Sequence, residues 1–275
     1  MFCLLENRAL LKISGSDAET FLHNQLTNDI FNLGTLSIQI NAYCQHQGKI
    51  LALLWVMRKD DAFLVSFPKD LINIIMPRLR MFVIMSEVII EDISENFYQI
   101  GLIHEKHLDT FAINSDLSLL ILDSVDSIQD QLNETQEWDL ACINSLLPEV
   151  YSATSEKLVP QMLNLDINEI GVNFSKGCYP GQEVVARLHY LGSAKRRLFS
   201  FKSTQEMLVG DSLYCASSKA ALVRGDRYKG SGIVVTKVKY NSLFYCLATL
   251  DLDLIDAEIT LNNEHGPKLE RINDE

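Results

Sequence analysis

The stretch Lys176-Gly177-Cys178-Tyr179-Pro180-Gly181-Gln182-Glu183 is the most distinctive part of this 275-residue chain. Two glycines and a proline stand so close together that the stretch cannot be a regular helix or strand. It predicts a tight turn, followed by a helix that Gly181 opens. Such a turn holds Cys178 beside unpaired backbone N–H groups, where an anion could bind or Lys176 could activate the thiol. The alternative is a structural corner in which Cys178 and Tyr179 fill core space.

The charge of the chain limits the partners that it can bind. It has 36 acidic and 24 basic residues, for a formal net charge of −12, which argues against binding nucleic acid by bulk electrostatics. The one compact basic run, Lys195-Arg196-Arg197, is expected to be a solvated linker.

Cysteine spacing and apolar runs indicate the compartment. The six cysteines are scattered, which is typical of reduced thiols in a cytosol rather than of a disulfide framework. The start of the chain has no signal-peptide pattern, and no apolar run approaches the roughly 20 residues of a membrane span. We therefore expect a cytoplasmic protein that makes no contact with a membrane.

The region before the turn alternates strands with helices. The patterns predict strands at 8–15, 50–57, 62–67, 88–90, 98–103 and 117–122, and helices at 16–29, 69–82 and 137–147. The strand at 50–57 is almost wholly apolar and should be buried on both faces. Ser16 and Glu19 form a capping-box pattern at the start of the first helix. Pro77 should kink or split the second helix.

Polar and aromatic residues on these helices are candidate ligand contacts. Gln25 and Asn28, near the end of the first helix, are either surface and capping groups or side chains that point into a ligand cavity. Trp138 is either a core residue or one wall of a flat aromatic ligand site. His104 and His107 have a spacing that could share a metal on a helix, but a third ligand is lacking, so we expect no metal site.

After residue 191 the pattern changes to short strands, at 197–202, 211–215, 232–238 and 243–250. The turns between and after them are marked by Gly210-Asp211, Gly225-Asp226, Gly230-Ser231-Gly232 and Gly266-Pro267. Short, evenly spaced strands with glycine turns predict a small barrel. The sequence thus predicts two domains, residues 1–191 and 192–275.

The turn at 176–183 resembles the K-G-C-[FY]-x-G-Q-E signature of the YgfZ family, relatives of the glycine-cleavage aminomethyltransferase that bind folate and serve iron–sulfur proteins. The likeness continues in Val185-Ala186-Arg187 and covers segments 15–29 and 160–165 as well. It implies a ring of two α+β lobes with a central channel, joined to a C-terminal β-barrel. Tetrahydrofolate would lie in the channel near the cysteine, and the candidate contacts on the signature segment are Tyr179, Gln182, Glu183 and Arg187.

Two departures from the family concern the wall of the folate site. Tryptophans help to form this wall in bacterial members, and Trp138 falls at one such position whereas Arg8 falls at the other. The guanidinium of Arg8 could stack on an aromatic ring or pair with the glutamate tail of the ligand. Asn144 falls where relatives often have a glutamate that can pair with the pterin edge. A neutral amide cannot supply a bidentate charged acceptor.

The resemblance implies an accessory protein for assembly or repair of iron–sulfur clusters, with indirect effects on tRNA modification, rather than an enzyme. Its partners would be a folate and either cluster-assembly factors or client enzymes, and Cys178 would be the reactive thiol. The alternative is a tetrahydrofolate-dependent one-carbon transferase, in which Asp70 weakly resembles the aspartate that begins a helix in aminomethyltransferases. A third class, direct tRNA binding, is disfavoured by the acidic charge.

Overall fold

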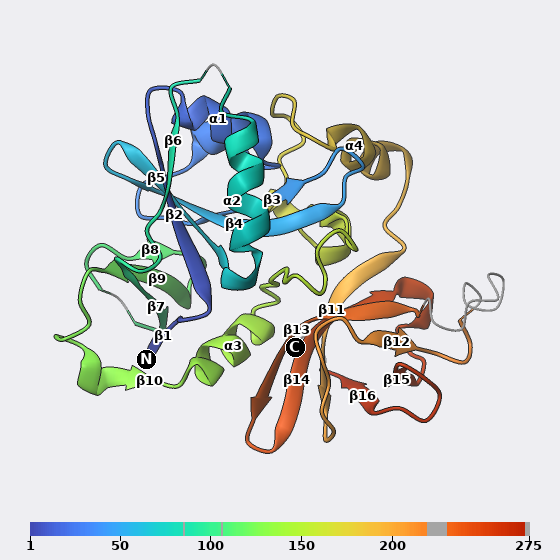
Figure 1. The fold of residues 1–275 in the computed structure, drawn as a ribbon. Coiled ribbons are helices and arrows are strands. Elements are labelled where there is room, and N and C mark those ends of the chain that lie inside the picture. Colours follow the sequence, from blue (N-terminus) through green and yellow to red (C-terminus); the bar gives the residue numbers. More distant parts are fainter. Residues whose placement is uncertain (85, 106, 219–229, 273–275) are drawn as a thin grey trace.

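The structure, a computed structural model, describes residues 1–84, 86–105, 107–218 and 230–272. Within these ranges the chain forms two five-stranded sheets with helices packed on them, followed by a closed barrel (Figure 1). The fold is therefore α+β with a C-terminal barrel, as expected. None of the helices in these ranges is long and apolar enough to span a membrane.

The first lobe is a sheet with the strand order β3-β4-β5-β2-β6. Its elements are β2 (Arg8–Ser14), α1 (Ala18–Gln25), β3 (Gln39–Cys44), β4 (Ile50–Lys59), β5 (Ala62–Pro68), α2 (Ile72–Met81) and β6 (Ile89–Asp92). Helices α1 and α2 cover one face, where Leu22 and Leu79 join the buried cluster of the sheet. Strand β4 is buried on both faces, as predicted, because Trp55 points away from the face that Val56 shares with the helices. Helix α2 runs on through Pro77 and is not split there.

The first helix begins and ends differently from the prediction. The capping box is wrong, because Ser16 Oγ donates to Glu87 at 2.7 Å and Glu19 pairs with Arg58. The helix also ends earlier than predicted. Its chain leaves the helical path because the N–H of Thr27 donates to a carbonyl of β3 instead of continuing the helical pattern.

The second lobe is a sheet with the order β10-β1-β7-β9-β8. Its elements are β1 (Phe2–Leu4), β7 (Tyr98–Ile103), β8 (Phe111–Ala112), β9 (Leu117–Leu122), β10 (Leu132–Asn133) and α3 (Thr135–Asn144). The chain therefore starts in the second lobe, where β1 pairs with β7, and then crosses into the first. Helix α3 lies between this sheet and the barrel and contacts both (Figure 1). Lys106, between the two candidate histidines His104 and His107, lies outside the described residues. Among the described residues, no three side chains are placed to hold a metal ion together.

The signature helix and the barrel complete the chain. Their elements are α4 (Gln182–Leu191), β11 (Arg196–Ser203), β12 (Ser212–Tyr214), β13 (Gly232–Tyr240), β14 (Leu243–Asp251), β15 (Ile259–Leu261) and β16 (Lys268–Arg271). The predicted boundary near residue 192 falls between α4 and β11, and the predicted turn at Gly225-Asp226 lies outside the described residues. The basic run is not a solvated linker. Arg196 pairs with Asp251 at 2.6 Å, and Arg197 pairs with Asp166 at 2.5 Å.

One hydrophobic core joins both lobes to the barrel. It includes Leu10 and Trp55 of the first lobe, Trp138 on α3, and Leu198 and Val235 of the barrel. The interior of the barrel is a separate cluster. Because the three parts share buried apolar side chains, residues that are far apart in the sequence meet where these parts converge.

Candidate functional site

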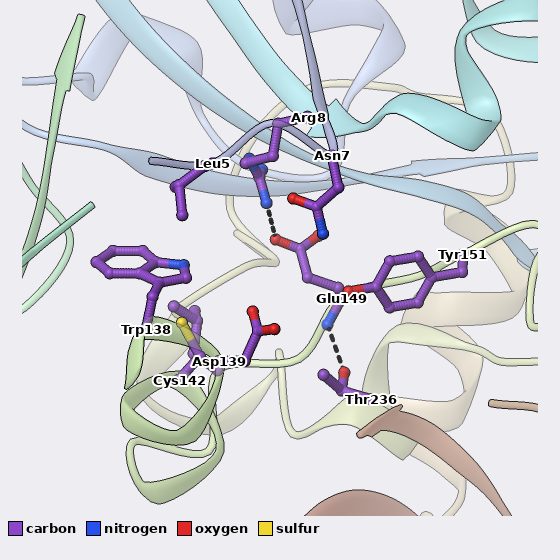
Figure 2. A pocket seen from close by; sticks show the side chains of 10 residues that line it. Leu5, Asn7, Arg8, Trp138, Asp139, Cys142, Glu149, Tyr151 and Thr236 are labelled. Atoms are coloured by element: carbon purple, nitrogen blue, oxygen red, sulfur yellow. Dashed lines mark hydrogen bonds and ion pairs between the residues drawn. The ribbon is translucent and has the colours of Figure 1, made fainter. Parts of the chain in front are cut away.

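A small hollow lies where the two lobes and the barrel converge (Figure 2). The residues that line it are Leu5, Asn7, Arg8, Trp138, Asp139, Cys142, Leu147, Glu149, Tyr151 and Thr236. The space open to the centre of a water molecule is about 20 Å³, little more than a single water needs. The centre of the molecule is therefore polar and narrow rather than an open channel at this point.

A buried ion pair between Arg8 and Glu149 closes the hollow (Figure 2). Their side chains are only 6% and 9% exposed. Arg8 Nε also donates to Ser66 Oγ at 2.8 Å, and the backbone N–H of Glu149 donates to Thr236 Oγ1 at 3.2 Å. The guanidinium carbon of Arg8 lies 3.7 Å from the ring centroid of Trp55. Arg8 thus ties the first lobe to the segment after α3, and through that segment to the barrel.

The two tryptophans meet behind this ion pair. The rings of Trp55 and Trp138 are 6.3 Å apart in an edge-to-face arrangement, and both are almost wholly buried. Trp138 lies against the bare backbone of Gly101, where an added Cβ would stand 2.3 Å from the indole carbon Cε3. Trp138 therefore belongs to the core, as one interpretation predicted, and also lines the hollow. Its role as a wall of an aromatic ligand site stays a prediction.

The carboxylates of the hollow are unusual in their environment. Burial raises the pKa of Asp139 to about 6, with Glu149 adding to the effect and Arg8 opposing it. Burial also raises the pKa of Glu149, again against the effect of Arg8. Two side-chain atoms of the residues that line the hollow, Arg8 Nη2 and Glu149 Oε2, are buried without a hydrogen-bond partner. The hollow can thus offer both donors and acceptors to a small polar molecule.

The signature stretch forms the predicted turn, and α4 follows it. Gly181 has φ +84°, and a Cβ there would lie 2.5 Å from the carbonyl oxygen of Gln45, so the turn packs closely on the β3–β4 hairpin. Tyr179 is buried and fills core space, whereas Cys178 is exposed. The cysteines other than Cys178 are all buried: Cys3, Cys44, Cys142, Cys215 and Cys246. The alternative of a structural corner, in which both side chains fill core space, is therefore confirmed for Tyr179 and wrong for Cys178.

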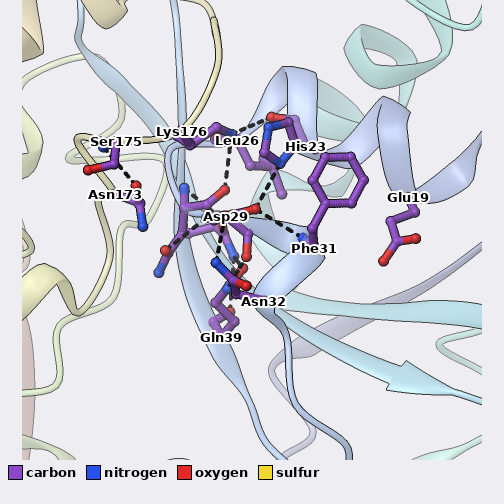
Figure 3. Close-up of polar contacts among 12 residues, drawn as sticks. Glu19, His23, Leu26, Asp29, Phe31, Asn32, Gln39, Asn173, Ser175 and Lys176 are labelled. Atoms are coloured by element: carbon purple, nitrogen blue, oxygen red, sulfur yellow. Dashed lines mark hydrogen bonds and ion pairs between the residues drawn. The ribbon is translucent and has the colours of Figure 1, made fainter.

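Lys176 does not serve Cys178 in the way that the sequence suggested. Its ammonium group donates to three backbone carbonyls at the end of α1, those of His23, Leu26 (2.5 Å) and Asn28 (3.0 Å) (Figure 3). Burial lowers the pKa of Lys176 to about 8. Because its donors are taken up by these carbonyls, its role is to fasten the signature loop to the first lobe.

The remaining candidates from the two lobes lie apart from the hollow. Asn28 is buried and donates to two backbone carbonyls at 3.2 Å, and Gln25 is half-buried at the end of α1. Asp70 is exposed, and its Oδ2 accepts from the N–H of Ser152 at 2.8 Å. Asn144 is exposed at the end of α3. The charged acceptor at the hollow is instead Glu149, a little later in the chain.

The candidates on the signature segment do not line the hollow either. Gln182 is half-buried, whereas Glu183 and Arg187 are exposed on α4. Of the predicted site residues, the structure brings only Arg8 and Trp138 together there. The hollow therefore does not include the signature cysteine, and the expectation of a ligand site near Cys178 stays a prediction. The sequence patterns did not point to Trp55 or Glu149, because one lies in a uniformly apolar strand and the other in a loop without a motif.

A pterin does not fit the hollow as it stands. A bicyclic ring needs far more room than a single water, and Arg8 covers the face of Trp55 on which such a ring would stack. The side chains suit a pterin in kind, since the carboxylates of Asp139 and Glu149 can accept from its N–H edge. The obstacle is space rather than chemistry.

Known proteins similar to this chain were found by sequence and by structure, although no family model matches it. It is 28% identical over 264 residues to an uncharacterized protein of Haemophilus influenzae, covering 94% of this chain and 91% of that protein. It is 26% identical to the tRNA-modifying protein YgfZ of Klebsiella pneumoniae (96% and 85% covered) and 27% identical to that of Aliivibrio fischeri strain MJ11 (98% and 92%).

Among solved structures, the glycine cleavage system aminomethyltransferase T from Bartonella henselae is similar, with a TM-score of 0.70. The match covers 99% of this chain and 84% of that one. The two sequences are only 11% identical, so this likeness shows the fold alone.

Proposed function

The chain belongs to the YgfZ family, and we propose that it supports tRNA modification as an accessory protein of iron–sulfur cluster assembly or repair. The proposal depends above all on Cys178, the exposed cysteine of the chain, which stands within the family's signature. Proteins named tRNA-modifying protein YgfZ match nearly the whole chain. The acidic net charge favours an indirect role over direct binding of tRNA.

The signature loop presents the thiol in a fixed place. Lys176 binds the loop to the end of α1, and Gly181, which has no side chain, allows the loop to pack closely on the β3–β4 hairpin. A preorganised loop loses little conformational entropy when a partner binds. One cysteine is too few to hold a stable cluster, so Cys178 would supply one thiolate ligand to iron that a partner protein holds with its own ligands.

The test is complementation in cells that lack the native gene. The Cys178→Ala variant should fail to restore both the activity of a cluster-dependent tRNA-modifying enzyme and the content of its modified nucleoside. A Ser175→Ala variant, changed at an exposed position of the same loop, should restore both. Full rescue by the alanine variant of Cys178 would remove the thiol from the function.

We also propose tetrahydrofolate or a derivative as the ligand of the hollow. The proposal is supported by the fold likeness to an aminomethyltransferase and by the carboxylates of Asp139 and Glu149. Binding would require Arg8 to leave the face of Trp55 and its partner Glu149. Titration with tetrahydrofolate, followed by tryptophan fluorescence, should show tighter binding to the Arg8→Ala variant than to the wild type. Equal affinity of the two proteins would place the ligand elsewhere.

A tetrahydrofolate-dependent one-carbon transferase is the second candidate function. Two carboxylates with raised pKa values, the half-buried Asp139 and the buried Glu149, line the hollow, an arrangement typical of general acid–base chemistry. Asp139 suits this role better than Asp70, which lies exposed and holds the backbone of Ser152. Release of formaldehyde, or formation of methylene-tetrahydrofolate from an aminomethyl donor, would support this candidate over the accessory role.

A further inference from the structure

His23 stands beside the signature loop although it is far from that loop in the sequence. It lies in the last turn of α1 and is only 8% exposed. The loop crosses this end of the helix, where Lys176 donates to the carbonyl of His23 (Figure 3). A Cβ added to Gly177 would lie 3.7 Å from His23 Nε2. The Nε2 edge of the imidazole therefore faces the backbone of the residue that immediately precedes Cys178.

Asp29 holds the other edge of the same ring. His23 Nδ1 lies 3.1 Å from Asp29 Oδ1, within ion-pair distance although not in the geometry of a hydrogen bond (Figure 3). Asp29 is itself held by the N–H of Phe31 at 3.1 Å and by the side-chain amide of Asn32 at 2.7 Å. Phe31 also stacks on the imidazole, with the ring centroids 4.2 Å apart. A carboxylate at Nδ1 favours the tautomer whose proton is on Nδ1, which leaves Nε2 free to accept a proton.

We propose that His23 accepts the proton of the Cys178 thiol through Nε2, directly or through one water, and that Asp29 orients the ring for this step. The S–H proton moves to Nε2, which leaves a thiolate on Cys178 and an imidazolium on His23. The imidazolium is then stabilised by Asp29. Nucleophile, base and orienting carboxylate in this order form a pattern that recurs in thiol and hydroxyl chemistry. The inference rests on the proposed function for its choice of Cys178 as the working thiol.

The surroundings of His23 keep its imidazole neutral, as a proton acceptor must be, but they also lower its affinity for the proton. Burial lowers the pKa of His23, and the neighbouring Lys176 lowers it further, whereas Asp29 and Glu19 raise it. The net direction is downward, so the imidazole is neutral near pH 7 and can take up a proton. Lys176 thus has a second effect besides fastening the loop, because its positive charge helps to keep His23 neutral.

The experiment measures alkylation of Cys178 by iodoacetamide in the full-length native protein, with the labelled peptide quantified by mass spectrometry. The other cysteines are buried and should label slowly in the folded state. The His23→Gln variant should lower the rate at about pH 7 by roughly tenfold, less than the roughly 10²–10⁴-fold that a positioned base contributes in catalysis. The matched control is His189→Gln on α4. His189 is exposed and stacks on Phe174, with the ring centroids 3.7 Å apart, and none of its atoms lies within 4 Å of a Cβ placed at Gly177. The alkylation rate of this variant should therefore equal that of the wild type.

An unchanged rate in a folded His23→Gln variant would overturn the proposal. If that variant does not fold, the titration of His23 is followed by NMR in the wild type and in Cys178→Ser. Loss of the neighbouring thiolate should displace the His23 titration curve, and identical curves would also overturn the pair. Neither readout uses a client enzyme. Rescue of cells by Cys178→Ala together with base-dependent alkylation would thus reject the proposed function and leave the Cys178–His23 pair standing.

Discussion

Two regions of the molecule differ in what their charged residues do: the central hollow and the signature loop. At the hollow, Arg8 and Glu149 are buried against each other and occupy the space that a ligand would need. At the loop, Lys176 donates to backbone carbonyls, and Cys178 two residues later is exposed. The chemistry that is accessible in this structure is therefore at the surface loop, whereas the centre is held shut by an ion pair that must separate before a large ligand can enter.

The largest expected effect follows from breaking that ion pair. Changing Arg8→Met leaves Glu149 buried without a partner, which should lower the free energy of unfolding by about 3–5 kcal/mol. Urea denaturation at neutral pH measures the loss. The Arg8→Met/Glu149→Leu double variant is the control, because it removes both charges and fills the space with apolar atoms. It should recover most of the stability. A single variant as stable as the wild type would show that the pair does not hold the hollow shut.

Releasing the signature loop should lower the free energy of unfolding by less than breaking the Arg8–Glu149 pair does. In Lys176→Met the charged donor to three carbonyls is lost, and the free energy of unfolding should fall by about 2–3 kcal/mol, since water can reach the freed carbonyls only in part. Amide hydrogen exchange should rise in the loop and at the end of α1. Lys49→Met is the matched control, because Lys49 is a lysine with one exposed bond to a carbonyl, at 3.3 Å. It should change stability by less than about 0.5 kcal/mol.

The carboxylates that line the hollow should make the stability of the protein depend on pH. Asp139 titrates at about 6 in the folded state against 3.8 ordinarily, so its neutral form favours folding. That contribution is complete below about pH 3.8 and is lost as the pH rises through about 6, because the unfolded state ionises first.

Asp139→Asn should therefore be more stable than the wild type at neutral pH, by about 1–2 kcal/mol. One pKa unit corresponds to about 1.4 kcal/mol, and the side chain keeps some contact with solvent. The difference should vanish near pH 3.5. Thermal denaturation of both proteins across this range measures the difference. A difference that does not vary with pH would show that Asp139 has the same pKa in the folded and unfolded states.

The signature loop was more predictable from the sequence than the hollow, for a physical reason. The turn, its glycine and the helix after it are local, since the steric demands of Gly181 and Pro180 act on their own neighbours. The strands β7 and β9 agree with the prediction residue by residue because their apolar patterns are local too. The hollow instead depends on β2, α3 and the barrel meeting, and no local pattern encodes that Glu149 would reach Arg8.

The same limit explains the missed elements and the missed histidine. Strands β1, β15 and β16 are short, so they give too few residues for a periodic pattern. His23 lies on a helix that reads as an ordinary amphipathic one, and only the return of the loop through residues 176–178 places Gly177 against its ring. Sequence reasoning identified Cys178 but not His23, because only the fold brings His23 against Gly177 in the same loop.

The smallest expected effect on stability is at Cys178 itself. Because the side chain is exposed and the loop is held by Lys176 and Gly181, Cys178→Ala should change the free energy of unfolding by less than about 0.5 kcal/mol. Cys142→Ala, in the buried wall of the hollow, should cost more, because it leaves a cavity in packed surroundings. Urea denaturation of the two variants compares the two regions with the same chemical change. A stable Cys178→Ala protein that fails in cells would assign the failure to the missing thiol, whereas a destabilised one would mean that the sulfur is part of the packing after all.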